Sequence, residues 1–323
     1  MDPKLKKVIA VTGATGFIGH AIYGRLIASN YSVRVLVRNP RKASARTFSD
    51  AEIIHGDLAD PDSLQRLVSG ADAVIHCAGA VRGATQAQFD RVNVAGTRNL
   101  LHAIKAGTTS PRLLFISSLA AREPQLSFYA ASKHRAEQVL KKEGSGIAWT
   151  VLRPPAVYGP GDRELLPVFR LMARGLALTP GLPGARFSML YIDDLSSAVI
   201  AWLGADLVAE EIFAIDDGHA KGYDWHDVGK VVGELCKRRV RVVRAPSWLL
   251  DVPAWANSRI GNLFGAAPML TPEKLRELRH HDWVCEGTSF QRAVNWRPNV
   301  QLPEGLRATP DWPGHRQGDI GPE

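Results

Sequence analysis

The chain is short of cysteine. Three occur among 323 residues, Cys77, Cys236 and Cys285, and their spacing is neither paired nor typical of metal ligands. This argues against a disulfide framework and a zinc site, and it favours a reducing compartment. The adjacent histidines His280 and His281 would point apart in a strand or a helix, so we predict no metal there either.

Long apolar runs are also missing. No run approaches the ~18 residues that suggest a membrane-spanning helix, so we expect no integral membrane segment. The charged residues 1–7 lead directly into the first predicted strand and leave no room for the apolar part of a signal peptide. We therefore expect a cytoplasmic protein.

Dense clusters of basic charge are absent although the formal net charge is +8. The densest groups, within residues 4–7 and 237–241, are short and typical of solvated surfaces. The sequence therefore predicts no nucleic-acid partner, and a small-molecule ligand is favoured.

The strongest positive signal is a glycine-rich turn after the β-branched run at residues 8–12. Gly13 can take a tight turn, Gly16 has no side chain to block a pyrophosphate, and Gly19 lets a helix pack closely on the strand. The spacing is Gly-x-x-Gly-x-x-Gly, which differs from the commonest dinucleotide fingerprint. We predict that a dinucleotide binds at this turn, at Gly13, Thr15, Gly16, Phe17 and Ile18.

Short strand-like runs alternate with helical patterns as far as Arg153. Such alternation predicts an α/β fold, a Rossmann-type doubly wound parallel sheet, which binds ligands at the carboxyl ends of its strands. Asp60 before Pro61 is typical of a helix start. The predicted strands are residues 8–12, 32–37, 51–55, 73–76, 112–117 and 149–153.

Beyond Arg153 the chain becomes rich in proline and glycine, which indicates a smaller, discontinuous C-terminal substrate lobe. Residues 189–192, a helix over 193–203 and a strand over 212–215 are predicted to return to the sheet. We expect a dinucleotide-binding domain of residues 1–157 plus 191–217. The substrate-binding lobe would contain residues 158–190 plus 218–323.

The segment 247–264 carries Trp248 and Trp255 among apolar residues near helical spacing. Two interpretations fit this pattern. We favour a lid or lobe helix that packs on its neighbours over a helix that lies on a membrane surface.

Tyr129 and Lys133 are four residues apart in a helical pattern, so both project from one face. A neighbouring cation lowers a phenol's pKa from ~10, and such a tyrosine can exchange a proton with a carbinol oxygen. Just upstream, a predicted strand ends in Ser117 and Ser118 and would deliver two hydroxyls to the same edge of the sheet.

The ordered series of motifs resembles the extended short-chain dehydrogenase/reductases over roughly residues 8–200. This group includes NAD-dependent epimerase/dehydratases, dihydroflavonol reductases and 3β-hydroxysteroid dehydrogenases. The matching pieces are residues 11–19, Gly56-Asp57-Leu58, His76-Cys77-Ala78-Gly79, residues 93–97, Ser117-Ser118, Tyr129 with Lys133, and residues 153–162.

The resemblance implies roles for individual residues. Tyr129 would be the general acid/base, Lys133 would hold the nicotinamide ribose and lower the Tyr129 pKa, and Ser118, favoured over Ser117, would bind the substrate oxygen. Asn93 would support the site's structure. Further cofactor contacts would come from Asp57, Leu58, Cys77, Ala78, Gly79 and Pro155.

The choice of cofactor depends on the end of the second strand, where an acidic residue would bind the ribose hydroxyls of NAD. This chain has Arg38 there, followed by Arg41 and Lys42. An arginine suits a 2′-phosphate and can stack on adenine. We therefore predict NADP(H), with NAD(H) as the alternative.

Three functions remain open. The favoured one is an NADP(H)-dependent carbonyl reductase or alcohol dehydrogenase acting on a small, fairly apolar substrate. A nucleotide-sugar epimerase or dehydratase with tightly bound NAD(P) comes second, and a cofactor-sensing or structural module third. Such folds often pair through helices such as the one that carries Tyr129, so a homodimer is one possible assembly, and the sequence leaves the oligomeric state open.

Two sequence features weigh against the nucleotide-sugar function. Members of that type often carry Arg-Asp where this chain has Phe187-Ser188, although Arg186 is adjacent. The interval from Ser118 to Tyr129 is 11 residues, shorter than is usual for large sugar substrates.

Overall fold

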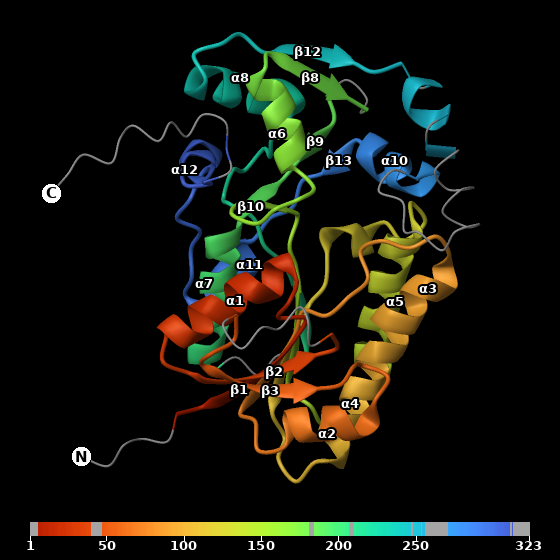
Figure 1. Cartoon of the computed structure of the whole chain (residues 1–323), viewed down its shortest axis with the longest axis vertical. Coiled ribbons are helices and arrows are strands. Elements are labelled where there is room, and N and C mark those ends of the chain that lie inside the picture. Colours follow the sequence, from red (N-terminus) through yellow and green to blue (C-terminus); the bar gives the residue numbers. More distant parts are fainter. Residues whose placement is uncertain are drawn as a thin grey trace, which may run out of the picture.

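The computed structural model describes residues 6–39, 47–180, 184–206, 210–246, 248–252, 254–255, 271–310 and 312. A parallel sheet covered by helices on both faces forms the larger part, and a smaller lobe of helices and short strand pairs lies at one end of it (Figure 1).

Seven parallel strands form the main sheet, in the order β11-β6-β5-β4-β1-β2-β3. The Rossmann-type prediction is confirmed. The order reverses between β1 and β4, and ligands bind in the crevice at such a point, outside the carboxyl ends of the strands. The strands are β1 (Val8–Thr12), β2 (Ser32–Val37), β3 (Ala51–His55), β4 (Ala73–His76), β5 (Arg112–Ile116), β6 (Trp149–Arg153) and β11 (Glu211–Ala214).

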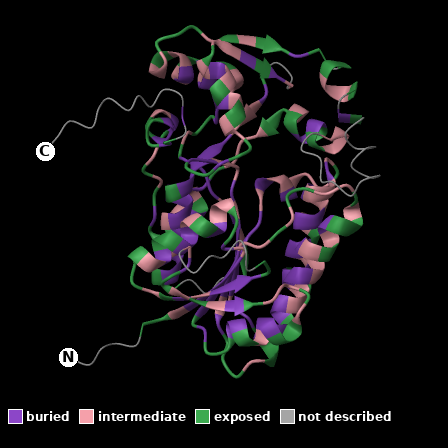
Figure 2. Ribbon diagram, in the orientation of Figure 1, coloured by how far each residue is buried: buried purple, intermediate pink, exposed green. Residues whose placement is uncertain are grey.

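Two separate apolar cores explain why helices cover both faces. One face packs against α1 (Phe17–Ala28), α7 (Ile192–Gly204) and α11 (Thr288–Val294). The other face packs against α2 (Pro61–Val68), α4 (Gly96–Ala106) and α5 (Phe128–Glu143). Strands buried on both sides are apolar at consecutive positions, and Figure 2 shows the sheet buried between helices whose outer sides are exposed.

The predicted start of α2 is confirmed by its cap, and α10 (Pro272–Arg279) begins in the same way. An Asp60 carboxylate oxygen accepts hydrogen bonds from the amides of Asp62 and Ser63 at 3.2 and 3.3 Å, which fixes the start of α2. Thr271 caps α10 through the amide of Lys274 at 3.2 Å. Each cap satisfies amides that would otherwise lack partners.

The lobe has its own core, built mainly from three helices and two short strands. These are α6 (Leu166–Ala173), α8 (Trp225–Leu235), α12 (Leu302–Arg307), β7 (Ala156–Tyr158) and β10 (Met189–Tyr191). Two further strand pairs join β8 (Leu176–Thr179) to β12 (Arg241–Arg244) and β9 (Arg186–Phe187) to β13 (Asp282–Trp283).

The prediction that residues 189–192 rejoin the main sheet is wrong. β10 pairs instead with β7, in parallel, with Leu190 opposite Val157. Met189 and Tyr191 contribute to the lobe core, so this pairing buries their side chains away from the sheet. Of the returning segments, α7 covers the sheet and β11 extends it beside β6.

The segment 247–264 is described at residues 248–252 and 254–255, which are helical. The rest of the predicted helix, including residues 256–264, lies outside the described residues. Trp248 is 66% exposed and Val252 62% exposed, so these two side chains do not pack as the favoured interpretation expected. Among the helices that the structure describes, none combines the length and apolarity needed to cross a bilayer.

Candidate active site

A backbone cradle lies where β1 turns into α1. Gly13 has φ +78°, and a Cβ added there would lie 2.5 Å from the amide nitrogen of Ala78. A Cβ on Gly19 would lie 2.2 Å from the Gly13 carbonyl oxygen. Gly16 is the N-cap of α1 and offers no side chain to the first helical amides. These features fit a pyrophosphate, which the free amides and the dipole of a helix N-terminus attract.

The neighbouring strand β4 pairs with β1 and ends beside the glycine turn. His76 is fully buried, with Nδ1 2.7 Å from the Thr12 hydroxyl and Nε2 3.1 Å from the Thr97 hydroxyl. Burial lowers the His76 pKa to about 3, so this imidazole is a neutral structural group. Burial raises the Cys77 pKa to about 12, which keeps the thiol protonated and unreactive.

The structure separates the two serines that follow β5. The Ser118 hydroxyl hydrogen-bonds the Tyr129 side chain and accepts the amide of Ala120 at 3.2 Å. The Ser117 hydroxyl is buried and donates to Glu137 at 2.6 Å. Of the two, Ser118 is thus the one beside the tyrosine.

Lys133 lies one turn after Tyr129 on α5. Its ammonium donates to the carbonyl of Ile116 at 2.9 Å and lies 4.7 Å from the centroid of the Phe115 ring. Burial lowers the Lys133 pKa to about 8. A Cβ on Gly79 would lie 3.4 Å from this nitrogen, so the absence of a side chain at Gly79 leaves room beside the buried ammonium.

The expected lowering of the Tyr129 pKa by Lys133 is not what the structure shows. Burial is the largest influence and raises the pKa of the phenol to about 12, which the hydrogen bond with Ser118 partly offsets. The phenol therefore keeps its proton near neutral pH.

Glu137 is a site residue that the sequence did not reveal. It is fully buried, one further turn along α5, and accepts hydrogen bonds from Ser117 and from Arg153 Nε at 2.9 Å, with a second contact from the same guanidinium. This network ties α5 to the ends of β5 and β6. The available signal was the four-residue spacing of Tyr129, Lys133 and Glu137.

Asn93 supports the site as expected. It lies in a π-helical turn, residues 91–95, which replaces regular helix before α4. Its amide group accepts from the Ala80 amide at 2.7 Å and donates to the Ala80 carbonyl at 3.0 Å and to Ser132 at 2.8 Å. The loop after β4 is thereby fixed to α5.

The other predicted cofactor residues follow the carboxyl ends of their strands, at the same edge of the sheet. Arg38 is exposed just after β2, and Pro155 follows β6. Asp57 accepts the amide of Ala59 at 2.7 Å, and Leu58 packs against Gly96. Arg41 and Lys42 lie outside the described residues.

The lobe holds both ends of the segment between Ser118 and Tyr129. Arg122 donates to the carbonyls of Val284, at 2.7 Å, and Asp282 in and beside β13. Ser127, the N-cap of α5, donates to the buried carboxylate of Glu277 on α10. The lobe therefore contacts the segment that connects Ser118 to Tyr129 directly.

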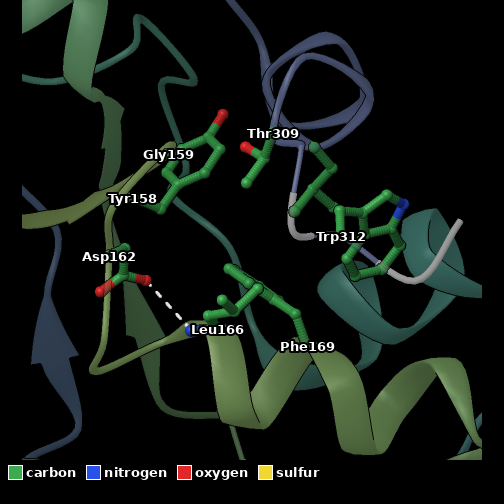
Figure 3. Close-up of a pocket in the computed structure, with 8 residues that line it drawn as sticks. Tyr158, Gly159, Asp162, Leu166, Phe169, Thr309 and Trp312 are labelled. Atoms are coloured by element: carbon green, nitrogen blue, oxygen red, sulfur yellow. Dashed lines mark hydrogen bonds between the residues drawn. The ribbon is translucent and has the colours of Figure 1, made fainter. Parts of the chain in front are cut away.

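A small pocket lies elsewhere in the lobe (Figure 3). Its volume of about 10 Å³ is the room that a single water molecule takes, so it cannot hold a substrate. None of Ser118, Tyr129 and Lys133 lines it. The lining residues are Tyr158, Gly159, Asp162, Leu166, Phe169, Leu306, Thr309 and Trp312.

Comparison with known proteins agrees with this geometry. The model of the NAD dependent epimerase/dehydratase family matches residues 9–215. The chain belongs to this family. It is an NAD(P)-dependent oxidoreductase of the extended short-chain dehydrogenase/reductase type.

Relatives in this family differ in the reaction that their names give. The chain is 32% identical to a ceramide reductase from Caulobacter vibrioides, over 97% of this chain and 96% of the relative. It is 26% identical to a UDP-glucose 4-epimerase from Vibrio cholerae, over 95% and 96%.

A UDP-glucuronic acid 4-epimerase from Bacillus cereus, solved in complex with UDP-glucuronic acid and NAD, shares the fold at a TM-score of 0.71 and 20% identity. The alignment covers 94% of this chain and 98% of that structure.

Proposed function

We propose that the protein is an NADP(H)-dependent carbonyl reductase that converts an apolar ketone into a secondary alcohol. The observation that carries the proposal is the hydrogen-bonded pair of Ser118 and Tyr129 at the end of β5, one turn from the buried ammonium of Lys133. The glycine cradle lies at the same edge of the sheet.

In this mechanism a bound dinucleotide supplies the hydride that the carbonyl carbon receives. Ser118 would orient the carbonyl oxygen, and Tyr129 would give that oxygen its proton. Because the Tyr129 pKa is raised to about 12, the phenol keeps its proton near neutral pH until a developing alkoxide takes it. Lys133 would place a positive charge beside the phenolate that remains.

The environment of Arg186 favours a reductase over a nucleotide-sugar epimerase. This arginine is next to the position where sugar-binding members often carry Arg-Asp. Its guanidinium donates to the carbonyls of Lys221 at 2.6 Å and Gly222 at 2.7 Å, and it pairs with Asp227 at 2.8 Å. A guanidinium engaged in this way has little capacity left to bind a diphosphate.

The relatives support an apolar substrate. The ceramide reductase matches almost the whole of both chains, so the similarity includes the lobe. We infer that specificity lies in residues 158–190 and 218–323, and that the substrate is a ketone on a long-chain lipid of the ceramide type. A smaller apolar ketone with the same reacting group would serve as a soluble analogue.

Cofactor consumption tests the proposal. The wild-type protein should deplete NADPH stoichiometrically when given the soluble ketone, and the alcohol should appear in equal amount. Conversion of a nucleotide sugar without net consumption of NADPH would overturn the reductase and identify an epimerase. Binding without turnover of either substrate would identify a sensor.

Arg38→Asp should change the cofactor preference. Losing a charge-assisted hydrogen bond to a 2′-phosphate, and placing a carboxylate there, should weaken NADPH binding by about 10- to 150-fold. NADH binding should not weaken. Fluorescence titrations of both cofactors measure this, with Arg307→Ser on the exposed side of α12 as the control. Tighter binding of NADH than NADPH by the wild-type protein would contradict the proposal.

The rate should also depend on pH through Lys133. Its pKa is lowered to about 8, so the ammonium loses its proton as pH rises through that value. Since kcat/KM for NADPH reports groups of the free enzyme, it should fall about tenfold per pH unit above pH 8. Lys133→Arg, which stays charged, should show no such fall, whatever its activity. A level wild-type profile to about pH 10 would contradict the assignment.

A further inference from the structure

Exposed apolar side chains gather in the lobe. Among the described residues, seven of the eight large apolar side chains that are strongly exposed belong to it, and Val81 is the exception at 64%. The seven are Leu178, Val243, Trp248, Leu249, Val252, Trp255 and Leu278.

The strand pair β8–β12 forms one part of this surface. Leu178 and Val243 are partners in the parallel register, and each is 44% exposed. Val242 faces the other way, because its side chain would lie 3.3 Å from a Cβ on Gly229 of α8. Arg241, two residues before Val243, therefore shares the outward face of β12.

The helical residues 248–252 form the second part. The chain reaches them within a few residues of the end of β12, at the top of Figure 1. Trp248 and Val252 are one turn apart, so they project from one side. Between them, Asp251 forms an ion pair with Arg279 of α10 at 2.8 Å. This ion pair holds the Asp251 side of the helical turn against the protein. We call Leu178, Arg241, Val243, Trp248 and Val252 the outer lobe surface, and the exposed Arg244 at the end of β12 lies beside it.

Positive charge borders this surface. Residues 228–246 carry six lysines or arginines and one carboxylate, Glu234. A groove of about 330 Å³ along α8 and the approach to β12 is lined by Lys230, Arg238 and Arg239 as well as by Glu234. Tryptophan and aliphatic side chains beside clustered basic residues are the composition of proteins that lie on an anionic bilayer.

We propose that the outer lobe surface docks the protein on an anionic phospholipid bilayer, where its substrate resides. The location of the substrate in the bilayer rests on the proposed function, since a long-chain ketone partitions into a bilayer. A second copy of the chain fits this surface less well. A two-fold interface would place Arg241 and the basic side chains beside it against their own copies, and like charges oppose association.

Sedimentation with vesicles tests the docking. The full chain should bind vesicles of phosphatidylglycerol and phosphatidylcholine more tightly than vesicles of phosphatidylcholine alone. Trp248→Ser with Val252→Ser should weaken binding about tenfold or more. Arg241→Gln with Arg244→Gln should weaken it about 30-fold, at about fivefold for each arginine. Val81→Ser, equally exposed but outside the lobe, should bind as the wild type does.

Several outcomes would overturn the proposal. These are no binding of the wild type to anionic vesicles, equal losses in the Val81 control, or a dimer that the Trp248 and Val252 changes dissociate. Fluorescence titration with NADPH shows that each variant is folded. The exposed pair Arg241 and Arg244 gives a second test if the Trp248 and Val252 variant fails to fold.

The experiments distinguish a failure of the docking proposal from a failure of the proposed reaction. The Trp248 and Val252 variant should reduce the soluble ketone at the wild-type rate but lose activity on a long-chain ketone presented in vesicles. If the wild type binds anionic vesicles but reduces neither ketone, the docking stands and the proposed reaction is wrong. If the wild type and the Trp248 and Val252 variant reduce both ketones equally fast, the docking proposal is wrong.

Discussion

Tyr129→Phe should lower kcat for ketone reduction by about 10²- to 10⁴-fold, the usual contribution of a positioned general acid. The change removes one hydroxyl, whose hydrogen-bond partner is Ser118, and leaves the ring in contact with Phe89. The phenylalanine variant should therefore fold normally and bind NADPH as the wild type does. Stopped-flow or steady-state oxidation of NADPH, with a fluorescence titration of the same preparation, measures both quantities.

The serine pair provides a matched control for this prediction. Ser118→Ala should reduce kcat, because Ser118 contacts Tyr129. Ser117→Ala should act mainly on stability, because the Ser117 hydroxyl donates to Glu137. A Tyr129→Phe enzyme that keeps more than about a tenth of the wild-type kcat would remove Tyr129 from the role of acid.

Glu137→Ala should cost about 3–5 kcal/mol of the free energy of unfolding, the typical effect of removing one partner of a buried ion pair. Arg153, whose side chain is only 21% exposed, would lose its carboxylate partner, and the buried Ser117 hydroxyl would lose its hydrogen-bond acceptor. Urea unfolding followed by tryptophan fluorescence measures the change.

Glu143 on the same helix is the appropriate comparison. It pairs with Arg98 at 2.9 Å, but both side chains are at least a third exposed. Because exposed pairs contribute about 0–1 kcal/mol, Glu143→Ala should have a small effect. Similar losses for the two variants would show that the Glu137 network does not stabilise the fold.

Local patterns explain how much of the fold could be predicted. The central strands of the sheet, such as β1 and β4, are apolar runs bounded by turns, and the glycine turn shapes the backbone within a few residues. β10 has three residues, so its pattern does not select between the sheet and β7. That choice depends on the lobe core, which assembles from distant segments.

The same distinction applies to the site. Tyr129 and Lys133 share one helix face, so their spacing could be recognised. Glu137 lies at the same spacing, but its hydrogen-bond partners Ser117 and Arg153 are 20 and 16 residues away and cannot be identified from that spacing. The exposure of Trp248 was not predictable either, because an amphipathic helix has the same period whether it packs on protein or on a bilayer.

The contacts from the lobe to the segment between Ser118 and Tyr129 have a consequence for the order of assembly during synthesis. The glycine turn, the strands of the sheet and α5 are all complete before α10 and β13 leave the ribosome. Ser127 and Arg122 acquire Glu277 and the carbonyls of Asp282 and Val284 only then. A nascent chain should therefore gain the ability to hold a dinucleotide before the segment between Ser118 and Tyr129 is fully ordered.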